Sequence, residues 1–571
     1  MVLSSETEKA RWIDVLKNDV EPWELSELDS IDGIKDAFTG DLRFGTGGIR
    51  CLMGIGPNRM NRLTIGKAAQ GLANWLSGFS VDRPVAIGYD TRIHSKEFVE
   101  VTACVLASNG IRSLLFHEPQ PTPVLDFAVR ELSCSAGVCI TASHNPRGYN
   151  GFKVYGPDGV QATDSMAHAI QAEISRVDPF KDVHPMAFGD ALRDGLVSYI
   201  GDGLLDRYHE TVMAQRLGVD CSNLRVVYSP LNGTGLEQSE RMLSALGVNY
   251  TLVESQSAPD GSFPNCPKPN PENPKAMARG MEQMAIEGAD LFIATDPDSD
   301  RVGVACMHKG TPRLLSGNEI GLLILDYLVK NSIRKGTLAP VAVTTVVTAP
   351  LADTICEANG VELRRTLTGF KYVGEQIGLI EAKDREYLLG FEESDGYLHG
   401  SYVRDKDGIN GVMLVCEVAA HHKKFDHDLV EALDIIYSTF GYMPGRQLTF
   451  SFPGEAGRAA MAKLMASLRA STPSLISGSS ISKTIDYLPG APMPIVCGTT
   501  DQTLQSSDVL EWRLDNGSRV LVRPSGTEPK LKCYVFAKAP TEEEAETLLG
   551  KLSDDVSALI DSKIRQEGDS A

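Results

Sequence analysis

The sequence predicts an α/β protein of three similar α/β domains, each with a mixed or parallel sheet, followed by a C-terminal α+β domain. Through the first three quarters of the 571 residues, short apolar runs typical of buried strands alternate with segments of helical periodicity. In the last quarter, the strand-like runs follow one another without regular helices between them. Since a domain usually holds about 100–200 residues, the length leaves room for about four.

The first round of this alternation opens with a helix after Thr64. Apolar residues recur there at helical spacing, namely Ile65, Ala68, Ala69, Leu72 and Leu76. We then expect strands over 84–89, 111–116 and 136–140, separated by helices over about 96–109 and 122–132. This order is typical of a parallel sheet with right-handed crossovers.

The same alternation returns twice and then changes. The strands expected in the second and third rounds are 224–229, 249–253, 290–294, 341–347, 361–365 and 387–391. The last quarter has strands at 448–452, 509–514, 518–522 and 531–536, then a helix that opens at Thr541 with Glu544 in a capping-box position. We therefore expect domains over 1–205, 206–312, 313–440 and 441–571.

The composition argues against several classes of protein. There are 75 acidic and 55 basic residues, a net charge of −20, and such a surface repels nucleic acid and anionic membranes. No apolar run reaches the roughly 18 residues that cross a bilayer, and the N-terminus has no secretory signal. The 11 cysteines are scattered, which is typical of reduced thiols. We expect a cytoplasmic protein without nucleic-acid or membrane partners, either a monomer or a small homo-oligomer.

The sharpest motif is Asp296-Pro-Asp298-Ser-Asp300-Arg301, directly after an apolar strand. On an extended or looped backbone, carboxylates at every second position lie on one side. Three such oxygen ligands suit Mg²⁺. An EF-hand calcium loop would need Gly at its sixth position and Glu at its twelfth, where this sequence has Arg301 and Met307. The remaining alternative is a solvated acidic turn.

A second motif, Thr141-Ala-Ser143-His144-Asn-Pro, follows the strand expected at 136–140. The carboxyl ends of parallel strands are where open α/β sheets bind ligands. Ser143 is not in a Gly-x-Ser-x-Gly elbow, so a hydrolase triad is not indicated; the alternative is an Asn-Pro turn with a capping serine. Lys153 lies ten residues further on, and by itself it would be a surface lysine.

Three further segments suit phosphate or sugar. Arg523-Pro-Ser525-Gly526-Thr527 combines a guanidinium, two hydroxyls and a glycine, which suits a phosphate cradle or a plain β-turn. The segment containing Glu392 and Ser394 suits sugar hydroxyls or a helix N-cap. The glycine-rich run that ends at Arg50 has neither P-loop nor dinucleotide spacing; it either brings Arg50 to a phosphate or forms a flexible turn.

Together and in this order, these segments resemble the α-D-phosphohexomutase family from Gly45 to Lys532. The four loops Thr-Ala-Ser-His-Asn-Pro, Asp-Pro-Asp-Ser-Asp-Arg, Gly-Phe-Glu-Glu-Ser and Arg-Pro-Ser-Gly-Thr-Glu-Pro-Lys look like the four active-site loops of that family. The details Thr-Gly-Phe-Lys-Tyr-Val and Arg-Asp-Lys-Asp-Gly look most like its phosphoglucomutase-2/phosphopentomutase branch.

The resemblance implies four domains around a central cleft, each contributing one loop. It implies that Ser143 carries a phosphoryl group and, with Asp296, Asp298 and Asp300, binds Mg²⁺. The residues expected to hold the transferring phosphate or to move protons are Arg50, His144, Lys153, Arg301 and Lys406. The residues expected to bind the sugar and the non-reacting phosphate are Thr368, Gly369, Glu392, Ser394, Arg523, Ser525, Gly526 and Thr527.

The activity implied is that of a phosphoglucomutase that interconverts glucose 1-phosphate and glucose 6-phosphate through glucose 1,6-bisphosphate. Phosphopentomutase and glucose 1,6-bisphosphate synthase remain alternatives. A Mg²⁺-dependent sugar phosphatase would use the same acidic loop but would not need a second phosphate clamp, and a non-catalytic sugar-phosphate sensor would not need Ser143 with three aspartates.

Overall fold

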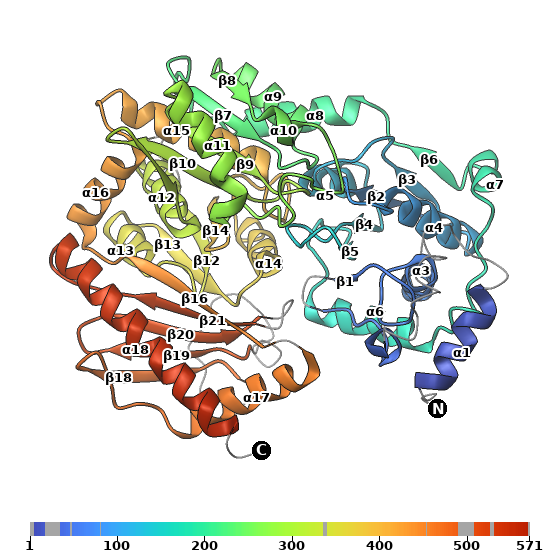
Figure 1. The fold of residues 1–571 in the computed structure, drawn as a ribbon. Coiled ribbons are helices and arrows are strands. Elements are labelled where there is room, and N and C mark those ends of the chain that lie inside the picture. Colours follow the sequence, from blue (N-terminus) through green and yellow to red (C-terminus); the bar gives the residue numbers. More distant parts are fainter. Residues whose placement is uncertain are drawn as a thin grey trace. The chain divides into compact units, whose positions relative to one another are not determined.

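The computed structural model describes residues 5–16, 35–45, 48–79, 82–334, 340–452, 454–488, 507–525 and 530–568. The chain forms two compact units, one of residues 1–314 with 396–420 and one of residues 315–395 with 421–571. Figure 1 shows that sheets and covering helices alternate along the chain, so the expected α/β class is confirmed. Over the described residues, no helix combines the length and the apolar character needed to span a membrane.

The first sheet has the strand order β1-β5-β4-β2-β3-β6. Strands β4, β2 and β3 run parallel, as expected, and the unpredicted edge strand β6 runs parallel to β3. Strand β5 runs antiparallel to both of its neighbours, the edge strand β1 and the inner strand β4, which makes the sheet mixed. The strands are β1 (Ile49–Leu52), β2 (Val85–Tyr89), β3 (Ser113–Leu115), β4 (Ala136–Ile140), β5 (Tyr149–Tyr155) and β6 (Val197–Tyr199).

Amphipathic helices cover this sheet. The expected first helix begins at Arg62 rather than after Thr64, because the side chain of Asn61 caps it in a reciprocal capping box with Thr64. Its residues Ile65, Ala68 and Leu72 lie in the core with the strands. The helices of this part are α1 (Ser5–Leu16), the 3₁₀ helix η2 (Lys35–Phe38), α3 (Arg62–Ser77), α4 (Ser95–Ser108), α5 (Thr122–Glu131), α6 (Asp164–Arg176) and α7 (Phe188–Arg193).

The second sheet has the order β11-β10-β9-β7-β8. Strands β7, β8 and β9 are parallel, and β10 pairs antiparallel with β9. Because β9 turns directly back into β10, the acidic motif lies in the tight connection between two buried strands. The elements are α8 (Gly203–Met213), β7 (Arg225–Ser229), α9 (Leu236–Ala245), β8 (Asn249–Leu252), α10 (Glu254–Ser257), α11 (Pro274–Glu287), β9 (Leu291–Thr295), β10 (Val302–His308) and β11 (Thr311–Leu315).

The third sheet is built on the parallel neighbours β13, β12 and β14, with helices between them, as expected. The capping box that opens α16 combines Asp428 with Glu431. The elements are α12 (Gly317–Arg334), β12 (Val341–Thr345), α13 (Leu351–Ala358), β13 (Glu362–Thr366), α14 (Phe370–Glu381), β14 (Tyr387–Glu392), β15 (Gly396–Leu398), α15 (Gly408–Lys423) and α16 (Leu429–Phe440).

The last sheet is antiparallel, in the order β16-β21-β20-β19-β18-β17. The expectation that no regular helix interrupts these strands is wrong, because α17 follows β16. Its residues Met461, Leu464, Met465 and Leu468 pack into the core with α18 (Figure 1). The elements are β16 (Gly445–Ser451), α17 (Gly454–Ala470), β17 (Leu475–Ile476), β18 (Ser479–Asp486), β19 (Leu510–Leu514), β20 (Arg519–Pro524), β21 (Lys530–Phe536) and α18 (Glu542–Gly568).

Candidate active site

Three aspartates converge in the loop that follows strand β9. The side chains of Asp296, Asp298 and Asp300 are at most 1% exposed. One oxygen from each carboxylate lies within 4.8 Å of the other two. The solvated acidic turn is therefore the wrong alternative, because these carboxylates are buried together on one side of the loop.

The backbone of the acidic loop is held at both ends. The N–H groups of Asp300 and Arg301 both donate to Oδ1 of Asp296, at 3.1 Å. Thr234, just before helix α9, donates its N–H and its hydroxyl to the carbonyl of Pro297, at 2.9 and 3.0 Å. These bonds restrict the backbone of the loop and hold its carboxylates on one side.

The pKa values of Asp296 and Asp298 shift in opposite directions. Burial, followed by the charges of Asp298 and Asp300, raises the pKa of Asp296 well above its usual value. Burial also disfavours the charge of Asp298, but Lys153 outweighs it and holds the pKa of this carboxyl below its usual range. Although burial lowers the pKa of Lys153, Asp298 and Asp300 raise it overall.

The donor set fits a hard divalent cation. The Oδ1 atoms of Asp298 and Asp300 are buried and have no hydrogen-bond partner among the residues that the structure describes. A buried carboxylate oxygen without a partner is costly. A Mg²⁺ ion, which prefers carboxylate oxygens and keeps positions open for phosphate or water, would satisfy these atoms.

Ser143 is placed against this acidic loop. It lies three residues after strand β4, in a left-handed conformation with φ of 52°. Its Oγ donates to Oδ2 of Asp296 at 2.9 Å and lies 3.2 Å from Nδ1 of His144. Its own N–H donates to Oγ1 of Thr141 at 2.8 Å. The hydroxyl, the imidazole and the acidic loop thus meet at one point.

The backbone of the Ser143 loop is held by a buried arginine that the sequence analysis did not single out. Arg92 pairs with Asp90 at 3.1 Å, and neither side chain is exposed. The Arg92 guanidinium donates to the carbonyls of Ser143, Asn145, Pro146 and Tyr149. A missed clue is that Asp90 follows strand β2, the parallel neighbour of β4, so both loops leave the same edge of the sheet.

Two lysines face the aspartates. The Nζ atom of Lys153 lies 2.7 Å from Oδ2 of Asp298 and 3.4 Å from Oδ2 of Asp300. The interpretation of Lys153 as a surface lysine is wrong, since it is 1% exposed on strand β5. Lys406 Nζ lies 3.1 Å from Oδ2 of Asp300. These ammonium groups balance part of the negative charge at the site.

The two arginines expected near the phosphate differ in their surroundings. Arg50 lies on β1 opposite Gly151, and its Nε is buried without a partner among the described residues. A Cβ on Gly151 would come within 2.3 Å of the Thr141 carbonyl, so only glycine permits this pairing. Arg301 Nη1 instead donates to Glu272 at 2.5 Å.

Two further residues position the site and were not predicted. Thr122 donates its N–H to the carbonyl of Asp298 at 2.8 Å and its hydroxyl to Oδ2 at 3.1 Å. Asp126, on the same helix α5, accepts the N–H groups of Arg404 and Asp405, which precede Lys406. Only the three-dimensional fold brings these distant segments together, and no local pattern marks them.

The expected sugar-binding residues lie in the second unit. Glu392 ends strand β14 and is 7% exposed, and Ser394 follows it. Thr368 is 8% exposed, and Gly369 has a φ of 119° as the N-cap of α14. The neighbouring Glu393 is engaged within this unit by hydroxyl groups of Thr345, Thr348 and Tyr534.

The expected phosphate clamp begins on strand β20 of the second unit. Arg523 pairs across the ladder with Lys532, and the N–H of Ser525 donates to the carbonyl of Lys530 at 2.8 Å. Arg523 and Ser525 therefore lie at the end of strand β20, beside the start of its antiparallel neighbour β21. The other two clamp residues, Gly526 and Thr527, lie outside the described residues.

Four family models match the chain in order. They are the phosphoglucomutase/phosphomannomutase α/β/α domain I over residues 41–180, domain II over 206–310, domain III over 316–436 and the C-terminal domain over 492–552. Two curated relatives are similar over most of their length. A phosphoglucomutase of Staphylococcus saprophyticus is 34% identical over 94% of this chain and 97% of its own. One of Staphylococcus aureus is 34% identical over 89% of this chain and 92% of its own.

Solved structures with the same fold have low sequence identity. Parafusin, a phosphoglucomutase from Paramecium in its open form, has a TM-score of 0.70 at 18% identity, over 92% of this chain and 96% of its own. A putative phosphomannomutase from Thermus thermophilus has a TM-score of 0.68 at 22% identity, over 91% of this chain and 99% of its own. These likenesses concern the fold.

Proposed function

We propose that this chain, which belongs to the phosphoglucomutase/phosphomannomutase family of the α-D-phosphohexomutase superfamily, is a phosphoglucomutase that interconverts glucose 1-phosphate and glucose 6-phosphate. The observation that carries the proposal is the position of the Ser143 hydroxyl, 2.9 Å from Asp296 in a buried acidic loop. The phosphoglucomutase relatives, 34% identical over about nine tenths of the chain, support glucose phosphates as substrates.

Ser143 would carry the transferred phosphoryl group. A sugar hydroxyl attacks the phosphorus of phosphoserine, the bond from phosphorus to Oγ breaks, and the hydroxyl proton passes to a basic group of the site. The product is glucose 1,6-bisphosphate, which returns its other phosphoryl group to Oγ after turning around. In such a transfer the protein mainly positions the reacting groups and balances their charge. Loops of fixed geometry are therefore its main contribution.

Asp296, Asp298 and Asp300 would hold Mg²⁺ together with an oxygen on Ser143. When bound, Mg²⁺ would draw negative charge from the phosphoryl group. Arg50, Lys153 and Lys406 would then hold the phosphate oxygens. His144, whose Nδ1 lies 3.2 Å from Oγ, would exchange the proton.

The remaining expected residues would bind the rest of the substrate. Glu392, Ser394, Thr368 and Gly369 would contact the sugar, and Arg301 would join the phosphate contacts. The phosphate at the other end would be held by Arg523, Ser525, Gly526 and Thr527. We place the domain boundaries at 205, 312 and 440, so that each domain carries one loop, and the ranges of the four family models support this division.

We place the enzyme in the cytoplasm, and glucose 1,6-bisphosphate is its expected activator. The described cysteines are all free thiols, which supports a reducing compartment. Its partners would be small sugar phosphates, and a monomer or a small homo-oligomer would suffice for this chemistry.

The test is replacement of Ser143 by Ala. We expect Ser143→Ala to lose turnover and to take up no label from [³²P]glucose 1,6-bisphosphate, whereas the wild type takes up one phosphoryl group per chain. Ser165→Ala, an exposed serine of α6, is the matched control and should behave as the wild type. Full activity in Ser143→Ala would refute the mechanism.

The substrate is tested in the same assay. Glucose, mannose, ribose and deoxyribose 1-phosphates are compared with catalytic bisphosphate present. Fastest turnover of glucose 1-phosphate would support the proposal. Fastest turnover of a pentose phosphate would make the enzyme a phosphopentomutase, and release of free phosphate in excess of isomerised product would make it a phosphatase.

A further inference from the structure

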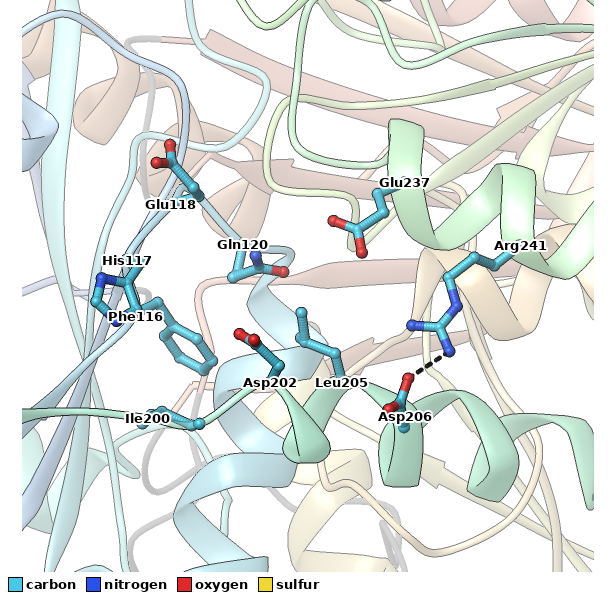
Figure 2. A pocket seen from close by; sticks show the side chains of 11 residues that line it. Phe116, His117, Glu118, Gln120, Ile200, Asp202, Leu205, Asp206, Glu237 and Arg241 are labelled. Carbon is cyan, nitrogen blue, oxygen red and sulfur yellow. Dashed lines mark hydrogen bonds and ion pairs between the residues drawn. The ribbon is translucent and has the colours of Figure 1, made fainter.

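The first unit has a pocket of about 260 Å³ that none of the candidate active-site residues lines. Figure 2 shows its three walls. One is the segment after strand β3, from Phe116 to Gln120. The second is the start of helix α8, and the third is the first two turns of helix α9, where Glu237 and Arg241 lie. Its volume is just below the usual range for drug-sized ligands, so it suits a small molecule.

The side chain of Gln120 is the first sign of a ligand. It is 8% exposed, and it makes no hydrogen bond through its side chain with any residue that the structure describes. Figure 2 shows its carboxamide in the middle of the pocket, between the carboxylates of Glu118, Asp202 and Glu237. The amide atoms of Gln120 are not among the buried polar atoms that lack a partner, so they are open to the pocket and can bond to a molecule that enters it.

The charged residues around Gln120 indicate the charge that a ligand would carry. Four acidic residues and one basic residue line the pocket, a net charge of −3. The one arginine, Arg241, pairs with Asp206 at 2.8 Å. Among the described residues, nothing forms an ion pair with Glu118, Asp202 or Glu237. Asp202 is the N-cap residue of α8, and Glu237 lies in the first turn of α9. A phosphate or another anion would be repelled.

The spacing of these charges argues for a long cation rather than a metal ion. In the part of the chain that the structure describes, only the active-site aspartates bring three ligand atoms within 4.8 Å of one another. No three carboxylates of the pocket meet that criterion. Apolar surface of Phe116, Ile200 and Leu205 lies among them. Separated negative charges with apolar surface between them suit separated positive charges joined by methylene groups.

We propose that this pocket binds a small linear polyamine. Its ammonium groups pair with Glu118, Asp202 and Glu237, and its methylene groups pack on Leu205 and its apolar neighbours. The carboxamide oxygen of Gln120 accepts a hydrogen bond from an ammonium or secondary amine N–H. This binding does not depend on the proposed catalytic activity.

Two walls of the pocket continue into the segments that hold the acidic loop. Two residues after Gln120, Thr122 bonds to Asp298. Just before α9, Thr234 bonds to Pro297. Because a ligand that orders either wall also acts on the loop, polyamine and Mg²⁺ binding are coupled, and typical couplings change an affinity about 5- to 150-fold.

Binding is tested by isothermal titration calorimetry of spermidine into the full chain. We expect one saturable site in the wild type. Glu118→Gln/Glu237→Gln should weaken it at least tenfold, since both carboxylates are exposed and their loss should not harm the fold. Gln120→Asn, which withdraws the amide by one methylene, should also weaken it. Glu210→Gln on helix α8 removes the same charge outside the pocket and should bind as the wild type does.

Three outcomes would overturn the proposal: no saturable binding, equal binding in the pocket variants and in the wild type, or an equal loss in Glu210→Gln. An equal loss of affinity in Glu210→Gln would mean that spermidine binds only through the net charge of the protein, which is −20. Circular dichroism of each variant confirms that the fold is retained.

For the coupling, the Mg²⁺ concentration for half-maximal activity is measured with and without spermidine. A shift of at least fivefold that disappears in the double variant is expected, and an unchanged value in the wild type would refute the coupling.

Discussion

Several charged side chains at the site are tolerated in a buried position only because a specific partner is buried with them. Asp296, Asp298 and Asp300 would repel one another at close range, and Lys153 and Lys406 offset part of that repulsion. Thr122 adds a hydrogen bond to the Asp298 carboxylate that already accepts from Lys153. Such outer partners orient metal ligands, so their loss should weaken metal binding without removing a ligand.

The Thr122 contact makes the first residue-scale prediction. Thr122→Val keeps the shape of the side chain and removes the hydroxyl that donates to Asp298. We expect the Mg²⁺ concentration for half-maximal activity to rise about 10- to 100-fold. The control is Thr102→Val, a buried threonine whose hydroxyl bonds only to its own helix, at Phe98. An equal effect in both variants would show that Thr122 has no specific role at the metal site.

The second residue-scale prediction concerns Arg92. Arg92→Met leaves Asp90 buried without its countercharge, so the free energy of unfolding should fall by about 3–5 kcal/mol. The turnover number should fall as well, because the loop of Ser143 loses the donor to its carbonyls. Urea unfolding and steady-state kinetics measure the two effects.

A double variant separates charge from packing. Asp90→Asn/Arg92→Met should recover part of the lost stability, since no buried carboxylate remains uncompensated. Arg193→Met, which removes a surface arginine that is 70% exposed, should change stability by no more than about 0.5 kcal/mol. No recovery in the double variant would show that the loss comes from the carbonyl hydrogen bonds and the packing of Arg92 and not from the uncompensated charge of Asp90.

Glycines decide how closely some helices and strands approach. Gly280 in α11 lies against Phe292 of β9, and a Cβ there would come within 2.1 Å of the ring. Gly378 in α14 has nothing within 4 Å of the same position. The same residue type therefore serves packing in one helix and only costs stability in the other.

This pair makes the element-scale prediction. Gly378→Ala should raise the free energy of unfolding by about 0.5–1 kcal/mol, because alanine loses less backbone entropy in a helix. Gly280→Ala should lower it by about 1–3 kcal/mol, because the methyl group overpacks the core at Phe292. Thermal unfolding of both variants gives the sign, and stabilisation by Gly280→Ala would contradict the packing described here.

On a larger scale, several chemistry-bearing loops of the first unit come together, although they leave different strands. In the first unit, loops after β2, β4 and β9 supply Arg92, Ser143 and the aspartates. The acidic loop contacts segments from distant parts of this unit. A ligand bound to the loop should therefore raise the free energy of unfolding of the whole unit.

Removal of metal tests this last expectation. Mg²⁺ at about 100 times its dissociation constant should stabilise the first unit by about 2.7 kcal/mol relative to the same protein in EDTA. Differential scanning calorimetry measures the shift, and potassium chloride at equal ionic strength is the control. An equal shift with potassium would show a general salt effect. Activity should disappear in EDTA and return with Mg²⁺.

Much of the fold was predictable because it rests on local patterns. The parallel strands around β2 and β4 are short apolar runs, and their bounds agree with expectation to within a few residues. The antiparallel direction of β5 was not predictable, since direction depends on which strand a segment finds as its neighbour. Helix α17 was missed although Met461, Leu464, Met465 and Leu468 have helical spacing, because the surrounding strands dominated the pattern.

By itself, the sequence determined the alternation of strands and helices, the α/β class and the three aspartates, since all of these depend on residues a few positions apart. Only the tertiary structure decided that Lys153 is buried against Asp298, that Arg92 holds the Ser143 loop and that Gln120 faces a pocket of carboxylates. The physical reason is distance along the chain. Periodicity acts between neighbours, whereas burial and charge pairing join residues that meet only after the sheets have packed.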